Sequence, residues 1–150
     1  MTAVKILIDT NIIIYAHSNH PLEAGKRQIA TSWLNQLEKE KRGYLTTQVL
    51  GEVSRQLLRI LAADLKRAYP KLASEVQALL TDYMKRFQVI LIEPQDIVEA
   101  LRGVEKHSLS FWDALIWACA KSNDIDTILT EDGPSGAVIE GVRYLNPFLE

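Results

Sequence analysis

A run of almost entirely apolar residues sets the strongest limit on how this chain can fold. Residues 111 to 120 are apolar at every position except Asp113. A helix that is apolar on all its faces is predicted to be buried inside the protein. A carboxylate on such a helix must be paired, protonated or bound to a cation, because an isolated buried charge costs several kcal/mol or more. Asp113 therefore needs partners from elsewhere in the chain.

Short apolar runs alternate with helical patterns along the whole sequence. Strands are predicted at residues 4–8, 44–46, 89–92, 127–130 and 142–145. Helices are predicted at 23–41, 47–61, 71–86, 95–106 and 110–122. Gly43 is expected to end the first of these helices and Thr47 to cap the second. This alternation predicts an α/β fold whose parallel sheet is covered by helices on both faces, with residues 1–150 forming one domain.

Acidic residues follow two of the predicted strands. Asp9 comes directly after the strand at 4–8, and Glu131-Asp132 come directly after the strand at 127–130. The carboxyl ends of parallel strands share one edge of a sheet, where ligands bind. If Ser110 caps its helix, Asp113 lies near a helix start that faces the same edge. The sequence therefore predicts one site that contains Asp9, Asp113 and an acid from the pair at 131–132.

Gathered carboxylates repel one another and raise each other's pKa, and a divalent cation removes that penalty. Mg²⁺ and Mn²⁺ prefer oxygen ligands, and they can polarise a phosphoryl oxygen and deliver a bound hydroxide. The single cysteine, Cys119, excludes an internal disulfide and a cysteine-based zinc site, and fits a reducing compartment. His17, His20 and His107 lack the spacing of zinc ligands.

Each acidic position also has a purely structural interpretation. Ser110-x-x-Asp113 fits a helix-capping arrangement, and Asp9-Thr10-Asn11 fits a turn. Glu131-Asp132 before Gly-Pro fits an ordinary loop. Glu52 lies off the apolar face of its helix, so periodicity alone predicts a solvated side chain. The case for a site therefore depends on these acids lying together.

The net charge of −2 conceals an uneven distribution. Residues 26 to 106 hold 14 Lys/Arg against 10 Asp/Glu, whereas the two flanks hold 3 basic and 9 acidic residues. A basic middle is compatible with a polyanion bound near an acidic centre, although any single charged pair also fits a solvated helix face. The candidate phosphate contacts are Arg55, Arg59, Lys66, Arg67, Lys85 and Arg86.

Other side chains and segments are assigned plainer roles. Trp33, Trp112 and Trp117 occupy helical positions and are predicted to be core residues rather than base-stacking surfaces. No stretch reaches transmembrane length, and the first apolar run contains Lys5 and ends at Asp9, unlike a signal peptide. A cytoplasmic protein with no membrane partner is the expectation.

Four segments, in order, resemble the motifs of PIN-domain nucleases. They are Ile6-Leu7-Ile8-Asp9-Thr10-Asn11, Thr47-Gln48-Val49-Leu50-Gly51-Glu52-Val53, Ser110-Phe111-Trp112-Asp113-Ala114-Leu115-Ile116 and Leu129-Thr130-Glu131-Asp132. The ending, residues 141–148, is similar to the tail of VapC-type members, so the likeness covers nearly the whole chain. The resemblance implies a PIN-like three-layer α/β/α sandwich with a central, mostly parallel sheet. It also implies a Mg²⁺- or Mn²⁺-dependent endoribonuclease that is the toxin of a type II toxin–antitoxin pair.

The resemblance also assigns roles by position. Asp9, Glu52, Asp113 and Asp132 would form the catalytic pocket, with Asp9, Asp113 and Asp132 as metal ligands. Glu52 would orient the attacking water or a second ion, and Thr10, Asn11 and Ser110 would be supporting polar groups. The implied partners are an RNA substrate, a cognate antitoxin protein and a second copy of the chain. An apolar patch on the helices between residues 23 and 61 is the expected partner surface.

One departure from the family pattern leaves an alternative open. Many members follow the fourth acid with lysine, aspartate and phenylalanine, whereas Gly133 and Pro134 stand here. Either Glu131 or Asp132 fits the fourth position, and motif alignment favours Asp132.

Two other functions compete with the nuclease. A PIN-fold binding module that does not cut is the first, although all four acidic positions are filled. A phosphotransferase with Asp9 as nucleophile is the second, although it needs an aspartate where Asn11 stands.

Overall fold

A mostly parallel sheet forms the centre of the molecule. The computed structural model describes residues 3–149. The strands are β1 (Ile6–Ile8), β2 (Gly43–Thr46), β3 (Gln88–Ile90), β4 (Thr127–Leu129), β5 (Val138–Ile139) and β6 (Val142–Leu145). They lie in the order β3-β2-β1-β4-β6-β5, and all neighbouring pairs are parallel except β5 with β6. The two earliest strands in the chain therefore lie near the middle of the sheet.

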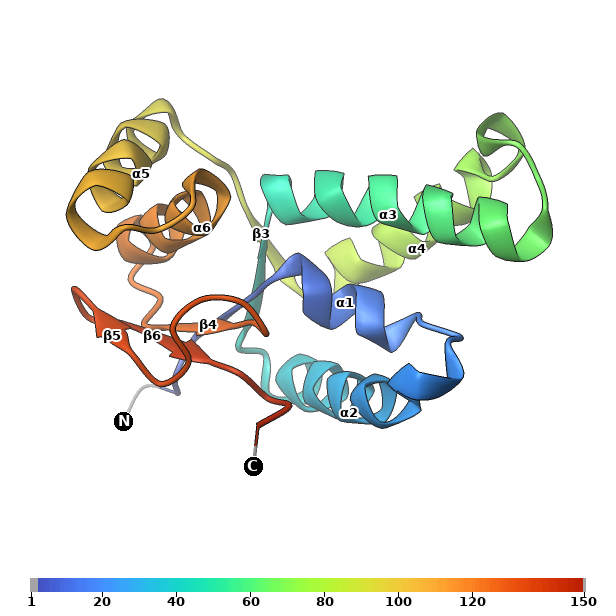
Figure 1. Cartoon of the computed structure of the whole chain (residues 1–150), viewed down its shortest axis with the longest axis horizontal. Helices are drawn as coiled ribbons and strands as arrows, with labels where there is room; N and C mark the ends of the chain where they lie inside the picture. Colours follow the sequence, from blue (N-terminus) through green and yellow to red (C-terminus); the bar gives the residue numbers. More distant parts are fainter. Residues whose placement is uncertain (1–2, 150) are drawn as a thin grey trace.

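Six α-helices in residues 3–149 flank this sheet (Figure 1). They are α1 (Thr10–Ala16), α2 (Ala24–Glu40), α3 (Thr47–Leu65), α4 (Ala73–Arg86), α5 (Pro94–His107) and α6 (Phe111–Ser122). Short 3-10 turns at Pro21–Glu23 and Tyr69–Lys71 precede α2 and α4. In Figure 1 the pair α5 and α6 lies at one side of the molecule, and α3 with α4 lies at the other. This arrangement confirms the predicted α/β class with a central, mostly parallel sheet.

The core is built on β1 and α6, as their sequences predict. Ile6, Leu7 and Ile8 are all buried, so β1 is covered on both faces. Every residue of α6 from Ala114 to Ala120 is buried. Within the described part of the chain, no helix combines the length and the apolar character that a bilayer crossing needs.

A glycine allows α6 to pack closely on α5. A Cβ atom at Gly103 of α5 would lie only 2.7 Å from Cζ3 of Trp117 in α6, and 3.5 Å from Cβ of Ala114. Trp117 is fully buried, and its indole N–H donates a hydrogen bond to the backbone carbonyl of Ile139, at 3.1 Å. This contact fixes the position of α6 relative to both its neighbouring helix and the β5–β6 hairpin.

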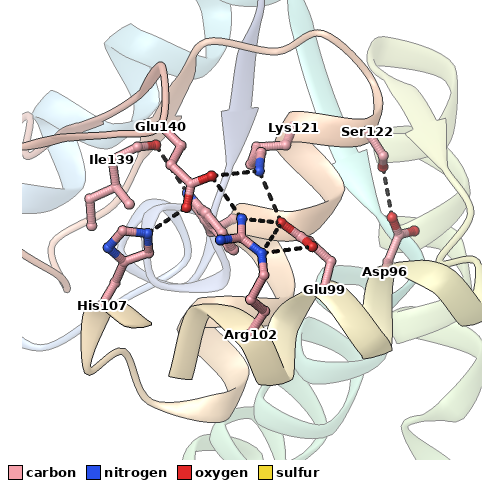
Figure 2. Close-up of polar contacts among 9 residues, drawn as sticks. Asp96, Glu99, Arg102, His107, Lys121, Ser122, Ile139 and Glu140 are labelled. Carbon is pink, nitrogen blue, oxygen red and sulfur yellow. Dashed lines mark hydrogen bonds and ion pairs between the residues drawn. The ribbon is translucent and has the colours of Figure 1, made fainter. Parts of the chain in front are cut away.

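A charged cluster holds the same three elements together at the surface (Figure 2). Glu140, in the turn between β5 and β6, accepts hydrogen bonds from Arg102 of α5 at 2.7 Å and from Lys121 of α6 at 3.1 Å. Nε2 of His107 hydrogen-bonds to the same carboxylate, at 2.5 Å. Glu99 accepts a second hydrogen bond from Lys121, at 2.9 Å. The C-terminal half of α6 is therefore fixed from two sides.

Two predicted helix boundaries are wrong by one residue each. Helix α2 ends at Glu40 because Lys41 adopts a left-handed conformation with a φ of 56°, so Gly43 does not end the helix. Gly43 instead begins β2, where a Cβ would lie 2.6 Å from Cδ1 of Phe87. The cap of α3 is Thr46 rather than Thr47, since the Thr46 side chain accepts a hydrogen bond from Val49 N–H at 3.1 Å.

Two elements and one surface also differ from expectation. The apolar run at 12–15 belongs to α1, and the short antiparallel strand β5 was not expected. The expected apolar patch between residues 23 and 61 is not found. Among the large apolar side chains exposed in residues 3–149, only Ile29 lies in that range, while Ile97, Val98 and Leu101 lie on α5.

Replacing Gly103 by alanine tests the close contact between α5 and α6. The added methyl group would collide with the buried Trp117 ring, so we expect Gly103→Ala to lower the free energy of unfolding by about 1–3 kcal/mol. Chemical denaturation measures this change. Gly25→Ala in α2 is the control, since its Cβ would have nothing within 4 Å. Equal stability of the two variants would contradict the proposed packing.

Candidate active site

Three carboxylates from separate elements meet at the carboxyl edge of the sheet. Asp9 directly follows β1, and Asp113 is the third residue of α6. Asp132 lies three residues after the end of β4, beyond the buried Thr130 and the half-buried Glu131. One carboxylate oxygen from each lies within 4.8 Å of the other two. Asp9 and Asp113 are half-buried and Asp132 is exposed. Asp113 is thus not enclosed in the core, because the first turn of α6 extends beyond its buried part.

Asp9 is held by donors that carry no charge. It caps α1, and its Oδ1 accepts a hydrogen bond from Thr10 N–H at 2.7 Å. Its Oδ2 accepts a hydrogen bond from the hydroxyl of Thr130 at 2.8 Å. Thr130 is buried, and its hydroxyl oxygen also accepts from Asp132 N–H at 3.0 Å. One threonine side chain therefore links the ends of β1 and β4.

Asn11 completes this link from α1. Its side-chain amide donates to Asp132 Oδ2 and to the Thr130 hydroxyl oxygen, both at 3.2 Å. Its side-chain oxygen accepts a hydrogen bond from Glu131 N–H at 3.2 Å. Ser110 has the capping role predicted for it, since its hydroxyl accepts from Asp113 N–H at 3.2 Å. These neutral groups orient the acids without neutralising them.

Glu131 and Asp132 are directed to different surroundings. Glu131 forms an ion pair with Lys26 of α2 and accepts a hydrogen bond from the Tyr15 hydroxyl at 2.5 Å. Burial alone would raise the pKa of Glu131, but the hydrogen bonds from Lys26 and Tyr15 outweigh it and lower that pKa. Asp132 instead joins Asp9 and Asp113. The geometry therefore favours Asp132 over Glu131 as the fourth acid of the motif.

Glu52 lines the same cavity from α3 but lies outside the group of three. Its carboxylate accepts hydrogen bonds from the Thr10 hydroxyl at 2.9 Å and from the Gln48 side-chain amide at 2.6 Å. Its negative charge is close enough to Asp9 to help raise the pKa of that residue. The structure thus brings all four predicted acids to one cavity, with Glu52 turned toward the site rather than simply solvated.

The crowding of acidic groups and their burial are reflected in the pKa of Asp9. Burial raises the pKa of Asp9 from 3.8 to about 6, and the charges of Glu52 and Asp113 add to that rise. The hydrogen bonds from Thr130 and Thr10 oppose it. No ion pair with a Lys or Arg reaches Asp9, Asp113 or Asp132 in residues 3–149. Such an all-oxygen, uncompensated donor set fits a hard divalent cation.

The acids open into a cavity of about 760 Å³. Its walls come from α1, α3 and the start of α6, and include Gln48, Gly51, Arg55 and Trp112. The volume lies in the range of small-molecule and cofactor sites, so it admits more than a single ion. Two buried polar atoms, Oε1 of Gln48 and the hydroxyl of Tyr144, have no hydrogen-bond partner among the described residues.

The predictions for the remaining side chains were right only in part. Trp117 is buried and Trp33 is half-buried, but Trp112 is 61% exposed, so its assignment to the core is wrong. Of the predicted phosphate contacts, Arg55 lines the cavity. Arg67 instead pairs with Glu75, and Arg86 with Glu38. None of the three histidines joins a potential metal-binding group in residues 3–149.

Some residues of the site carried no sequence signal. The sequence predicts Thr130 as the end of a strand and Gln48 as an ordinary helix position, and it assigns neither structure nor role to Tyr15. The one available clue was the place of Thr130 between a predicted strand and the pair of acids. Gly133 is explained only by the structure, because its φ is +82° and a Cβ there would lie 2.8 Å from Cδ1 of Tyr144.

Comparison with known proteins identifies the class to which this fold and its acidic cavity correspond. Residues 6–133 match the PIN domain family model, and the chain belongs to the PIN domain family. No curated protein sequence matches the chain.

Solved structures share the fold over nearly the full chain. A toxin–antitoxin complex from Klebsiella pneumoniae has a chain 21% identical, with a TM-score of 0.65, covering 96% of this chain and 98% of that one. FitAcB from Neisseria gonorrhoeae is 19% identical, with a TM-score of 0.60, covering 95% and 98%. VapC20 from Mycobacterium tuberculosis, a sarcin–ricin loop cleaving toxin, is 17% identical, with a TM-score of 0.59, covering 86% and 91%. At these identities the likeness establishes the fold.

The raised pKa of Asp9 makes stability depend on pH. The folded protein holds the Asp9 proton more tightly than the unfolded chain, so the cost of ionising it grows as pH rises from 3.8 to above 6. Over this interval we expect the metal-free wild type to lose on the order of 2 kcal/mol of unfolding free energy relative to Asp9→Asn. Denaturant titrations of both proteins at several pH values measure the difference. A difference that does not change with pH would contradict the raised pKa.

Metal-dependent stabilisation distinguishes Asp132 from Glu131. At about ten times its dissociation constant, Mg²⁺ should stabilise the wild type by about 1.4 kcal/mol. We expect this increment to be retained in Glu131→Gln, although loss of the Lys26 ion pair lowers the overall stability of that variant. It should be largely lost in Asp132→Asn. Thermal unfolding with and without Mg²⁺ provides the readout, and the opposite pattern would assign the fourth acid to Glu131.

Proposed function

We propose that this protein is a Mg²⁺- or Mn²⁺-dependent endoribonuclease that hydrolyses RNA phosphodiester bonds. The observation that carries the proposal is the cluster of Asp9, Asp113 and Asp132 at the sheet edge of a PIN domain. Three carboxylates with no basic partner in the described residues are unfavourable together unless a cation joins them. The cavity beside them is large enough for part of a polymeric substrate.

The residues of the site have separable roles in this proposal. Asp9, Asp113 and Asp132 would hold the cation, which when bound supplies Lewis-acid polarisation of a phosphoryl oxygen and lowers the pKa of water. Glu52, fixed by Thr10 and Gln48, would orient the attacking water and accept its proton. Attack of this water on the phosphorus would break the bond to the 3′-oxygen, which takes up a proton as it leaves, and the products would be a 5′-phosphate and a 3′-hydroxyl.

Basic side chains on α3 are suited to hold the RNA backbone near this chemistry. Arg55 lines the cavity, and Arg59 is exposed one helical turn further along α3. Guanidinium groups bind phosphate oxygens and so fix the position of the strand without reading its sequence. Their positions, one and two helical turns beyond Glu52, support a substrate path along α3.

We infer that the enzyme is the toxin of a type II toxin–antitoxin pair and acts in the cytoplasm, and that residues 1–150 form a single PIN domain. The likeness to a chain of the Klebsiella pneumoniae toxin–antitoxin complex, which covers 96% of this chain and 98% of that one, supports this assignment. A cognate antitoxin protein is then the expected inhibitor. A second copy of the chain is the expected partner in a homodimer.

Cleavage of RNA pools by the purified, antitoxin-free protein tests the proposal. We expect cleavage that requires Mg²⁺ or Mn²⁺, stops with EDTA and falls at least about 100-fold in Asp113→Asn, because a metal ligand is lost. Asp82→Asn on α4 is the matched control, since Asp82 is an exposed aspartate outside the cavity. Equal activity in wild type and Asp113→Asn would indicate a contaminant or a different site. A folded wild type that cuts nothing would favour the non-catalytic binding module.

A further inference from the structure

Trp112 is an exposed aromatic side chain at the edge of the acidic cavity. Its side chain is 61% exposed, although residues 114–120 of the same helix are all buried. It lines the cavity together with Asp113, the next residue in the chain. Single exposed apolar side chains are common on protein surfaces and need no explanation. The exposure of Trp112 does need an explanation, because this residue lies beside the proposed metal ligands.

The indole ring is held in place and yet remains open to a ligand. Phe111, which is half-buried, contacts it edge to face, with 5.1 Å between the ring centroids. Both residues lie in the first turn of α6, directly after the Ser110 cap. An aromatic side chain restrained in this way offers a large contact surface at a small cost in conformational entropy. Trp112 is therefore suited to stack on a planar group.

The charges of the cavity give a reason why a stacking surface is needed. Among the described residues that line it, five are acids and Arg55 alone is basic; the acids are Asp9, Glu23, Glu52, Asp113 and Asp132. An RNA backbone approaching this cavity meets repulsion that a single arginine and bound cations must overcome. Stacking of a base on an aromatic ring contributes attraction that does not depend on the phosphate charge.

The opposite wall of the cavity leaves room for a strand. Gly51 of α3 lines the cavity, is exposed and has nothing within 4 Å of the place where a Cβ would be. Glycine inside a helix lowers its stability relative to alanine, so an interior glycine without a packing reason suggests close approach by a ligand. Arg55 follows four residues later and therefore shares its face of the helix. Figure 1 shows that α3 begins on the side of the molecule that faces α6.

We propose that Trp112 stacks on an unpaired nucleobase adjacent to the phosphate that is cut, while the Gly51–Arg55 face of α3 receives the neighbouring backbone. A base inside a duplex stays in its own stack and cannot reach the indole ring. The contact therefore requires an unpaired base beside the phosphate that is cut. This inference rests on the nuclease function proposed above and adds the residue that contacts the base and the helix face that receives the backbone.

Tryptophan fluorescence tests the stacking contact separately from cleavage. The probes are single-stranded oligoadenylate and oligouridylate, and the duplex formed from the two, titrated in Ca²⁺ with the integrity of the RNA checked on gels. We expect both single strands to quench the fluorescence of the wild type and the duplex to quench it much less. Trp33→Phe should retain the quenching and Trp112→Phe should lose it, since Trp117 is buried.

Affinity measured by anisotropy of end-labelled RNA gives the second readout. Trp112→Ala should bind single-stranded RNA about 5- to 150-fold more weakly, and Trp112→Phe should recover most of that loss because phenylalanine still stacks. Tyr69→Ala is the matched control, since Tyr69 is a 47% exposed aromatic residue outside the cavity. It should bind like the wild type. Thermal unfolding checks that each variant is folded.

Three results would overturn the inference. The first is wild-type affinity in Trp112→Ala together with metal-dependent cleavage at an unchanged KM, which leaves the nuclease intact but removes the stacking role. The second is a change in self-association of Trp112→Ala on sedimentation with no change in RNA affinity, which would make Trp112 a protein contact. The third is a wild type that binds and cuts no RNA, which would remove the proposed function as well.

Filling the α3 wall tests the path of the backbone. We expect Gly51→Leu to be at least as stable as the wild type, because leucine favours helix and nothing lies within 4 Å of the new Cβ. Its affinity for single-stranded RNA should nevertheless fall at least about fivefold, since the side chain would enter the cavity. Gly25→Leu, in α2 and outside this cavity, should bind normally. Normal binding by Gly51→Leu would exclude the α3 path.

Discussion

Mutual repulsion of three carboxylates is the constraint around which the rest of this structure is arranged. Several acidic groups elsewhere in residues 3–149 pair with basic neighbours, as Glu131 does with Lys26 and Glu140 with Arg102. Asp9, Asp113 and Asp132 form no such pair, and burial, with a smaller contribution from the charges of Glu52 and Asp113, raises the pKa of Asp9 to about 6. The three carboxylates therefore lack the stabilisation that basic partners would provide. A bound cation would supply it by relieving their mutual repulsion.

The sheet was predictable because its strands are short, buried and separated by clear helical patterns. The β-branched run that becomes β1 is signalled by composition alone. Helix α1 could not be predicted in this way, because its seven residues are too few to show a helical period and its start depends on capping by Asp9. The C-terminal end of α2 and the two-residue strand β5 were also not predicted correctly. The left-handed Lys41 is set by local backbone hydrogen bonds to Glu38 and Leu37, which a lysine in the sequence does not signal. Val138 pairs with Arg143 across a short hairpin, which local propensity does not signal either.

The acids of the site were predictable to different degrees. Asp9 and the pair at 131–132 follow strands, and the rule that strand ends share an edge brings them together. Adjacent residues at a strand end point in different directions, so the choice between Glu131 and Asp132 needed the contacts of Lys26 and Asn11. Trp112 was wrongly predicted to be a core residue, because an apolar run does not reveal at which residue a helix emerges from the core. Only the packing of α6 against the sheet fixes that point.

The hydrogen bond between Thr130 and Asp9 joins positions 121 residues apart in the sequence. The carboxylate group therefore assembles only when β1, β4 and α6 have all docked, and contacts of this sequence separation form late and slowly. An incompletely folded chain carries every acidic residue but no assembled centre. For a protein proposed to cut RNA in the cell that makes it, these long-range contacts mean that the nuclease centre does not form until folding is complete.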